Sequence, residues 1–276
     1  MSLKRPSLAY HDEKFLESDE ARPLRIMAEY LQPLRALREE HVSETVVFFG
    51  SSRLREDGPN GRYVTEATEL ARLVTQWSLS LPRNGDRSKA EEIPRSANGA
   101  PRENRLVVCS GGGPGIMEAV NKGASLAGGR SVGLNIGLPH EQRPNPYITP
   151  ELSFEFHYFF MRKLWFAHLA RAIVVFPGGF GTFDELFEML TLAQTRKLDR
   201  NMLILLYGST YWKEVINFEA LVRHGVIGEE DLGLFSFVDE PRAALERLQS
   251  GIALDPTPAP RPAFAKSRHP QGDDAM

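Results

Sequence analysis

Two short apolar segments in this chain each lead directly into a glycine-rich turn and then into a helical pattern. The first, residues 106–109, is followed by Ser-Gly-Gly-Gly-Pro-Gly at 110–115, and the second, residues 172–176, by Pro-Gly-Gly-Phe-Gly-Thr at 177–182. A buried strand that turns tightly into a helix is the repeating unit of a parallel α/β sheet. The two units therefore favour an open α/β sheet with functional turns at the carboxyl ends of its strands.

The same alternation continues along most of the chain. We expect strands at 45–49, 105–109, 131–136, 152–157, 172–176 and 202–207. We expect helices at about 21–40, 63–79, 115–127, 158–170, 182–196, 211–224 and 240–249. Pro33 falls inside the first helical pattern and should kink or split it. Alternating strands and amphipathic helices predict an α/β fold: a single Rossmann-like domain with a doubly wound parallel sheet flanked by helices.

The α/β pattern occupies the middle of the 276-residue chain. We expect a helical extension at 1–43, the α/β domain at 44–250 and a disordered tail, rich in proline and charge, at 251–276. A polar stretch at about 80–104 contains several prolines and glycines. It is long for a loop in a compact domain, so we expect a surface insertion there.

Composition excludes several classes of protein. A formal net charge of −3 leaves no basic surplus for general nucleic-acid binding. No apolar stretch approaches the roughly 20 residues of a membrane span, and residues 1–14 lack the apolar segment of a secretory signal. We therefore expect a cytoplasmic protein without nucleic-acid or membrane partners. The single cysteine, Cys109, ends an apolar run and is expected to be a small buried side chain rather than a reactive thiol.

The turn at 177–182 has the chemistry of a phosphate cradle. A glycine turn at the start of a helix leaves backbone N–H groups free, next to the positive end of the helix dipole. Glycines also let the backbone approach an anion closely. We therefore expect a small phosphorylated molecule, in particular a nucleotide, to bind here. The expected phosphate-binding residues are Gly178, Gly179, Gly181 and Thr182.

Two further turns are expected to complete a nucleotide site. Neither glycine turn is a Walker A sequence, and neither matches the dinucleotide fingerprint with its acidic residue about 20 positions on. Two strand–glycine–helix units in one chain nevertheless support a nucleotide site in an open α/β sheet. The expected nucleotide-binding residues are Gly50 and Ser51 after the first strand, Gly112, Gly113 and Gly115 in the other glycine turn, and Lys163.

These motifs together resemble the LOG (Lonely Guy) family, whose members were long labelled "possible lysine decarboxylase". The matching segments are Met-Arg-Lys at 161–163, Pro-Gly-Gly-Phe-Gly-Thr at 177–182 with Glu185, Gly-Gly-Gly-Pro-Gly-Ile-Met-Glu-Ala at 111–119 and Phe-Gly-Ser-Ser at 49–52. Leu-Pro-His-Glu-Gln at 138–142 with Asn145 is similar to the longer bacterial subgroup. The resemblance covers about residues 44–225.

The resemblance implies a function and a catalytic pair. It implies a Rossmann-like nucleotide-binding catalytic domain, a homodimer with active sites near the subunit interface, and hydrolysis of the N-glycosidic bond of a nucleoside 5′-monophosphate. The products would be a free base and ribose 5-phosphate. Arg162 and Glu185 would be the catalytic residues. This chemistry needs no metal, and no lysine in the matched motifs stands out as a Schiff-base partner for pyridoxal phosphate, so we expect no cofactor.

Each candidate also has a purely structural interpretation. Glu185 stands three residues after Thr182, the spacing of a capping box, in which it would only satisfy the helix start. In a first helical turn the dipole would lower its pKa and favour a carboxylate over a general acid. Arg162 could be an ion-paired surface residue, and Lys163 a solvent-facing or structural residue.

The function also has an alternative of a different class. A non-catalytic protein could use the same fold to sense a nucleotide or carry a phosphorylated cofactor, as molybdenum-cofactor carriers that resemble this family do. Retention of both Arg162 and Glu185 favours the enzyme. AMP is the leading substrate candidate, because nothing in the chain gives a reason to assume a cytokinin hormone. Cytokinin riboside 5′-monophosphate is another candidate, since nothing in the sequence selects the base.

Overall fold

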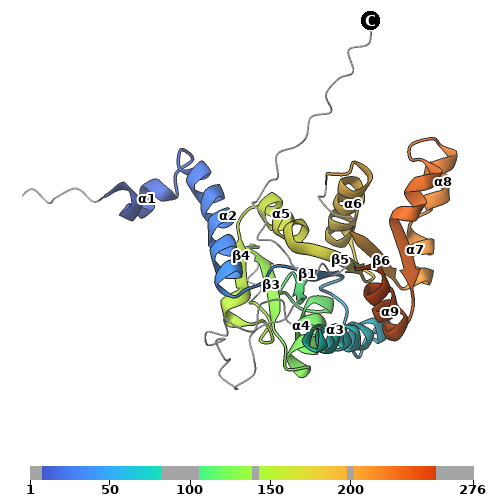
Figure 1. Ribbon diagram of the computed structural model, residues 1–276. Helices are drawn as coiled ribbons and strands as arrows, with labels where there is room; N and C mark the ends of the chain where they lie inside the picture. Colours follow the sequence, from blue (N-terminus) through green and yellow to red (C-terminus); the bar gives the residue numbers. More distant parts are fainter. Residues whose placement is uncertain (1–7, 82–105, 139–142, 198–201, 253–276) are drawn as a thin grey trace, which may run out of the picture.

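The computed structural model of the protein describes residues 8–81, 106–138, 143–197 and 202–252. Within these residues the centre is a seven-stranded sheet, and all neighbouring strands run parallel (Figure 1). The strands are β1 (Thr45–Phe49), β2 (Val107–Ser110), β3 (Ser131–Ile136), β4 (Ser153–Phe156), β5 (Ala170–Val175), β6 (Leu203–Tyr207) and β7 (Phe235–Val238). The α/β fold predicted from the alternating pattern is confirmed.

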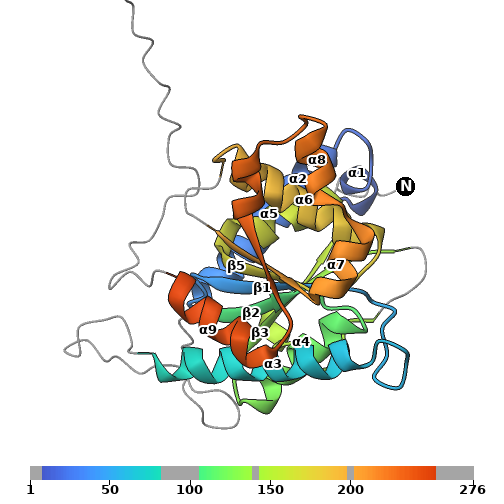
Figure 2. The ribbon, with the colours of Figure 1, turned by 90° about the vertical axis from the view of Figure 1, so that its right-hand side faces the viewer.

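Helices cover both faces of this sheet. The α-helices are α1 (Glu13–Leu16), α2 (Arg22–Glu39), α3 (Arg62–Ser80), α4 (Ile116–Leu126), α5 (Phe159–Leu169), α6 (Phe180–Gln194), α7 (Ser209–Val215), α8 (Phe218–Arg223) and α9 (Pro241–Gly251). Short 3-10 helices lie at η1 (Ala9–His11), η3 (Pro150–Leu152) and η4 (Glu229–Leu234). In Figure 2 the sheet lies edge-on between α3, α4 and α9 on one side and α5 and α6 on the other.

Alternating side chains of the strands supply the two halves of the core. On β1, Val46 and Phe48 pack against α3, α4 and α9, whereas Val47 and Phe49 pack against α5 and α6. This period of two is what a strand buried on both faces imposes. The sheet is therefore the middle layer of a three-layer domain.

The order of the strands creates the crevice in which ligands of such sheets bind. Along the sheet the order is β4-β3-β2-β1-β5-β6-β7. The chain runs outward from β1 to β4 and then returns to place β5 on the other side of β1. Ligands of doubly wound sheets bind at this reversal, beyond the carboxyl ends of the strands. In this protein the loops that follow β1 and β5 flank the reversal.

The structure corrects several expected element boundaries. Helix α2 runs unbroken from Arg22 to Glu39 through the buried Pro33, so Pro33 does not split it, and the alternative of a kink stays a prediction. The helix expected at 211–224 is two helices, because Ile216 is extended (φ −133°) and the Asn217 side chain caps the start of α8. The four-residue strand β7 was not expected, since Phe-Ser-Phe-Val is too short to stand out in a sequence.

Two expected segments fall largely outside the described residues. The insertion at about 80–104 is described only for its first two residues, and the tail from 251 only to residue 252. The disorder expected for the tail therefore stays a prediction, as do the domain limits at 1–43 and 44–250. Helix α2 nevertheless packs onto the core through Ile26, Tyr30 and Leu34.

Candidate functional site

Three turns from distant parts of the sequence meet at the carboxyl edge of the sheet. The Ser51 amide donates to the Pro177 carbonyl at 3.0 Å, and this bond ties the turn after β1 to the turn after β5. The Ile116 amide donates to the Ser51 carbonyl at 3.0 Å, and this bond adds the turn after β2. A side chain on Gly50 would strike Ile116, and one on Gly115 would strike the Ser51 carbonyl. The structure thus gathers the three predicted turns around the strand-order reversal.

The turn after β5 presents several unpaired N–H groups. Gly179 is the N-cap of α6, so the helix begins at Phe180 rather than at Thr182. Among the described residues, the N–H groups of residues 179–182 have no backbone or side-chain acceptor. The aromatic ring of Phe180 projects into solvent, with 96% of its surface exposed. This end of the helix has the free donors that an anion requires.

The earlier start of α6 removes the capping-box interpretation of Glu185. Thr182 is the third residue of the helix and is buried, and Glu185 lies in the second turn rather than the first. The helix has no side-chain cap. The capping-box interpretation of Glu185 is therefore ruled out, and its side chain contacts Arg162 instead.

Arg162 and Glu185 form a buried ion pair. An Arg162 Nη donates to Glu185 Oε1 at 2.8 Å, and the exposed fractions of the two side chains are only 11% and 12%. Arg162 comes from the second turn of α5, which starts at the carboxyl edge of the sheet after β4. The guanidinium carbon lies 5.4 Å from the ring centre of Phe159 and 5.6 Å from that of Phe166. The two predicted catalytic residues are thus in direct contact, and the buried Arg162 Nε has no partner among the described residues.

Burial sets the protonation of Glu185. Desolvation raises its pKa to about 7, although the Arg162 charge acts in the opposite direction. The sequence-based expectation of a lowered pKa was therefore wrong in sign. It relied on a first-turn position, whereas the residue lies in the second turn and is enclosed between α5 and α6. A carboxyl group that titrates near neutral pH can exchange protons during a reaction.

Lys163 connects the helices that carry the pair. Its ammonium lies 3.2 Å from an Asp184 carboxylate oxygen and 3.0 Å from one of Glu188. Burial acts to lower the pKa of Lys163, but the bonds to Glu188 and Asp184 outweigh it and the pKa is raised. These contacts support the structural interpretation of Lys163, and its assignment to nucleotide binding stays a prediction.

Buried amide side chains hold the turn after β2. Asn145 Nδ2 donates to the carbonyls of Gly112 and Gly113 at 2.9 and 3.2 Å, and also to Asn121 Oδ1 at 2.9 Å. Gly112 and Gly115 have φ of 76° and 69°, which only glycine adopts at low cost. Because the side chain of Asn145 engages the carbonyls, the turn has a fixed shape. Of the neighbouring motif segment, residues 139–142 lie outside the described part of the chain.

Several residues that support the site were missed in the sequence. The Tyr211 hydroxyl donates to the Gly178 carbonyl, and Trp212 Nε1 donates to the Val175 and Tyr207 carbonyls at 3.2 and 3.0 Å. Glu29 of α2 accepts from the amides of His157 and Tyr158 at 2.7 and 3.3 Å, just before α5. The contacts of Tyr211 with Gly178 and of Glu29 with residues 157 and 158 join segments far apart in the sequence, so no local pattern could have revealed them.

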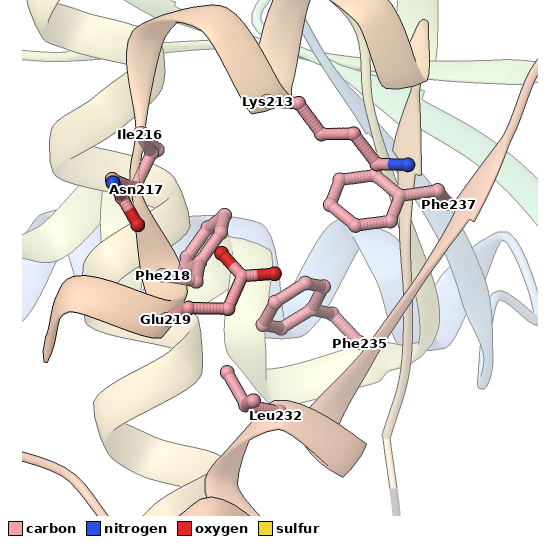
Figure 3. Close-up of a pocket in the computed structure, with 8 residues that line it drawn as sticks. All are labelled: Lys213, Ile216, Asn217, Phe218, Glu219, Leu232, Phe235 and Phe237. Carbon is pink, nitrogen blue, oxygen red and sulfur yellow. The ribbon is translucent and has the colours of Figure 1, made fainter. Parts of the chain in front are cut away.

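A separate cavity lies away from these residues. It has a volume of about 280 Å³ and lies between α7, α8 and β7 (Figure 3). In Figure 3 the Glu219 carboxylate points between the rings of Phe218 and Phe235, and Lys213 passes over Phe237. None of the predicted site residues lines it. The remaining lining residues are Ile216, Asn217 and Leu232.

Metal-binding clusters and membrane-spanning helices are both absent from the described residues. No group of three or more His, Cys, Asp or Glu side chains there has the geometry to hold a metal ion. Among the helices that the structure describes, none has the length and apolar character needed to cross a bilayer. Cys109 is buried, and burial raises the pKa of its thiol, as expected for a core side chain.

A model of a known protein family matches part of the chain. A family model described as "Possible lysine decarboxylase", the former label of the LOG proteins, matches residues 117–248. The matched region includes Arg162, Glu185 and the turn after β5, which the structure joins into one site. The match spans 132 of the 276 residues, so the chain is similar to the LOG family over just under half of its length.

Comparison with curated proteins finds distant relatives of this protein. The "Pyrimidine/purine nucleotide 5'-monophosphate nucleosidase" of Escherichia coli strain K12 is 32% identical over 98 residues, which cover 31% of this chain and 20% of that protein. The protein of the same name from Escherichia coli O157:H7 matches with the same values. The chain thus spans about a fifth of the length of the curated relatives it matches.

Solved structures also resemble this protein at a distance. A molybdenum cofactor binding protein from the phototrophic bacterium Rippkaea orientalis has a TM-score of 0.49 and 14% identity, with 76% of this chain and 98% of that chain covered. The Moco carrier protein from Chlamydomonas reinhardtii has a TM-score of 0.45 and 18% identity, with 75% and 98% covered.

Proposed function

We propose that this protein hydrolyses the N-glycosidic bond of nucleoside 5′-monophosphates and releases a free base and ribose 5-phosphate. The observation that carries this proposal is the buried contact between Arg162 and Glu185 at 2.8 Å, beside a helix start with unpaired N–H groups. The pyrimidine/purine nucleosidases of Escherichia coli, which the chain matches over a fifth of their length, are named for the same class of substrate. AMP is the leading substrate candidate.

The turn after β5 would hold the 5′-phosphate. The N–H groups at the start of α6 point out of the helix end and would donate to phosphate oxygens, next to the positive end of the helix dipole. Gly179 and Gly181 have open space where a side chain would stand, so an anion can approach their backbone closely. The Thr182 hydroxyl, which has no hydrogen-bond partner among the described residues, would add one more donor.

Glu185 would act on the ribose and the attacking water. Cleavage of the bond gives C1′ oxocarbenium character, which a nearby carboxylate stabilises. As the carbon–nitrogen bond breaks, its electron pair leaves with the base, and water adds to C1′. Glu185 would accept the proton that this water loses, and the departing base would take up a proton from solvent, so that a neutral free base is released. The raised pKa, about 7, makes the carboxylate a stronger base than an exposed glutamate while leaving much of it ionised at neutral pH.

Arg162 would orient Glu185 and bind the substrate. A guanidinium is always protonated, so Arg162 cannot act as a base. One Nη holds the Glu185 carboxylate, and the Nε has no partner among the described residues. A buried donor without an acceptor is costly, so a substrate oxygen or base nitrogen that accepts from Arg162 would be bound favourably.

We further propose that the protein is a homodimer. Leu24, Met27 and Leu31 recur at helical spacing on α2, and each is about half exposed. Phe159 and Phe160, at the start of α5, are also about half exposed. An apolar surface of this kind on a water-exposed helix is typical of an interface. It would lie next to the helix that carries Arg162, which agrees with active sites near the subunit boundary.

The test is a direct assay of base release. Purified protein is incubated with AMP, GMP, CMP, UMP and a cytokinin riboside 5′-monophosphate, and free base and ribose 5-phosphate are separated by chromatography. Glu185→Gln keeps the size of the buried side chain and removes its charge. Asp184→Asn is the matched control, because Asp184 is the adjacent acid and contacts Lys163 rather than Arg162. We expect release by the wild type and by Asp184→Asn, and a loss of at least about a hundredfold in Glu185→Gln.

Two other results would contradict the hydrolase proposal. Equal release by the wild type and by Glu185→Gln would show that Glu185 is not catalytic. Tight binding of AMP without release of any base across the panel would favour the nucleotide sensor or cofactor carrier instead.

A further inference from the structure

The phosphate-binding turn is fastened by a residue 33 positions further along the chain. Tyr211 lies on α7, which follows the neighbouring strand β6, and its hydroxyl donates to the Gly178 carbonyl. Its ring packs edge-on against Trp212 with 5.1 Å between ring centres. Trp212 is fully buried and anchored by bonds to two strand carbonyls. The Tyr211 hydroxyl is therefore held in a fixed place beside the turn.

This bond fixes the direction of one peptide group. The C=O of Gly178 and the N–H of Gly179 belong to the same peptide unit, and the described residues contain no cis peptide bond. In a trans peptide the two groups point in opposite directions. While the carbonyl is directed at Tyr211, the Gly179 N–H must point away from α7. No acceptor among the described residues binds this N–H.

The bond also keeps the Gly178 carbonyl out of the helix. In a regular helix this carbonyl would accept from the Thr182 amide, four residues on. Here the first such bond of α6 runs from the Phe183 amide to the Gly179 carbonyl at 3.0 Å, and the Gly178 carbonyl binds Tyr211 instead. The Thr182 N–H is therefore left available at the helix start, together with those of Gly179 and Gly181.

We propose that Tyr211 is a positioning residue that aims the N–H groups of the turn at the phosphate of the substrate. This inference rests on the proposed function and deepens it, since it assigns the shape of the anion site to a residue outside the glycine motif. Tyr211 touches the turn and not the substrate. Without its hydroxyl, the Gly178–Gly179 peptide can rotate, and the Gly178 carbonyl can enter the helix and take the Thr182 N–H. Burial raises the pKa of Tyr211, so the hydroxyl stays a donor at neutral and mildly alkaline pH.

The experiment compares two ligands that differ only in the phosphate. Binding of AMP and of adenosine to the full chain is measured by calorimetry at 4 °C for the wild type, Tyr211→Phe and Tyr207→Phe, with base release followed separately. Tyr207→Phe is the matched control, because it removes the hydroxyl of a tyrosine buried nearby on β6, and this hydroxyl makes no hydrogen bond to the turn. Thermal unfolding of each variant checks that it is folded.

The two ligands separate positioning from general damage. We expect the Kd for AMP to rise about tenfold in Tyr211→Phe, which corresponds to one or two misdirected hydrogen bonds. The Kd for adenosine should stay within about twofold, and Tyr207→Phe should bind both ligands like the wild type. Unchanged AMP affinity in Tyr211→Phe, or an equal loss for AMP and adenosine, would overturn the inference.

The design also separates this inference from the proposed function. AMP that binds to the wild type but is not cleaved refutes the hydrolase, while the comparison of affinities still decides the place of Tyr211. A wild type that binds neither AMP nor inorganic phosphate overturns both.

Discussion

Gly178, Gly179 and Gly181 stand within four positions of one another, yet a Cβ atom would meet different surroundings at each. On Gly178 it would overlap the Thr182 side chain, whereas on Gly179 and Gly181 it would meet nothing within 4 Å. None of the three has a positive φ. Gly178 is therefore needed for packing, and the other two leave space that the fold itself does not use. Open space at a helix start is what a bound anion would fill.

A substitution can separate these two reasons for glycine. Gly181→Ala should stabilise the protein by about 0.5 kcal/mol, because alanine is the better residue in a helix, and should lower the affinity for AMP. Gly178→Ala should destabilise it by about 1–3 kcal/mol through the clash with Thr182. Urea unfolding and calorimetry measure both quantities. Full AMP affinity in a stabilised Gly181→Ala would place the phosphate elsewhere.

The burial of Glu185 has a consequence for stability. Its pKa in the fold is about 7, above the value of 4.5 for an exposed glutamate. The folded protein therefore binds this proton more tightly than the unfolded chain, and the free energy of unfolding falls as the pH rises from about 4.5 to about 7. Between pH 5 and pH 8 the wild type should lose about 2–3 kcal/mol relative to Glu185→Gln. Urea titrations of both proteins at the two pH values measure this difference, and a constant difference would contradict it.

The same titration should appear in catalysis. If Glu185 must be ionised to accept the proton of water, kcat/KM for AMP should rise with pH through a midpoint near 7. An exposed glutamate would give a midpoint nearer 4.5. A pH–rate profile between pH 5 and 9, with the protein shown to be folded at each pH, decides between them. Activity that falls over the same range would instead make Glu185 a general acid.

Among the elements, the N-terminal helix α2 makes direct contacts at the start of α5. Its Glu29 carboxylate accepts two backbone N–H groups just before α5, and its Glu29 carbonyl accepts from Trp165 Nε1 at 3.1 Å. Helix α5 has no cap from its own N-cap residue. The N-terminal helix therefore supplies the cap for the helix that carries Arg162, and the extension and the site are coupled.

Removal of this cap should be measurable. Glu29→Ala leaves the amides of His157 and Tyr158 without their acceptor and should lower the free energy of unfolding by about 1–2 kcal/mol. Glu39→Ala is the matched control on the same helix, since Glu39 makes only a solvent-exposed pair with Arg35, which contributes little to stability. Urea unfolding gives both values, and hydrogen exchange should show faster exchange at His157 and Tyr158 in Glu29→Ala alone. Equal effects of the two substitutions would argue against the cap.

The starts of helices and strands were predicted from the sequence less accurately than the elements themselves. Strands β1, β3 and β6 were predicted within one residue, because apolar runs between polar turns mark them. The start of α6 was placed two residues late, since Thr182 resembles an N-cap, and this error also produced the wrong sign for the pKa of Glu185. The local pattern was right in kind, but packing decided which residue began the helix.

At the scale of the whole molecule, the proposal of a homodimer depends on the half-exposed apolar residues Leu24, Met27 and Leu31 of α2. We expect the wild type to sediment as a dimer. The double substitution Met27→Glu and Leu31→Glu places two like charges at half-exposed apolar positions and should give a monomer. Leu126→Glu, at an exposed apolar position on α4, should leave the dimer intact. Sedimentation velocity at several concentrations tests this, and a monomeric wild type would refute the homodimer.

The sequence by itself determined the class of fold and the three turns, and its resemblance to the LOG family supplied the pair of candidate catalytic residues. Periodicity, glycine and charge are local properties, and a parallel sheet brings all such turns to one edge. Only the tertiary structure decided that Glu185 is buried against Arg162, that Tyr211 binds the Gly178 carbonyl, and that Glu29 caps α5. Burial and long-range contacts depend on how distant segments pack, and the pKa of a carboxyl group depends on that enclosure more than on its neighbours in the chain.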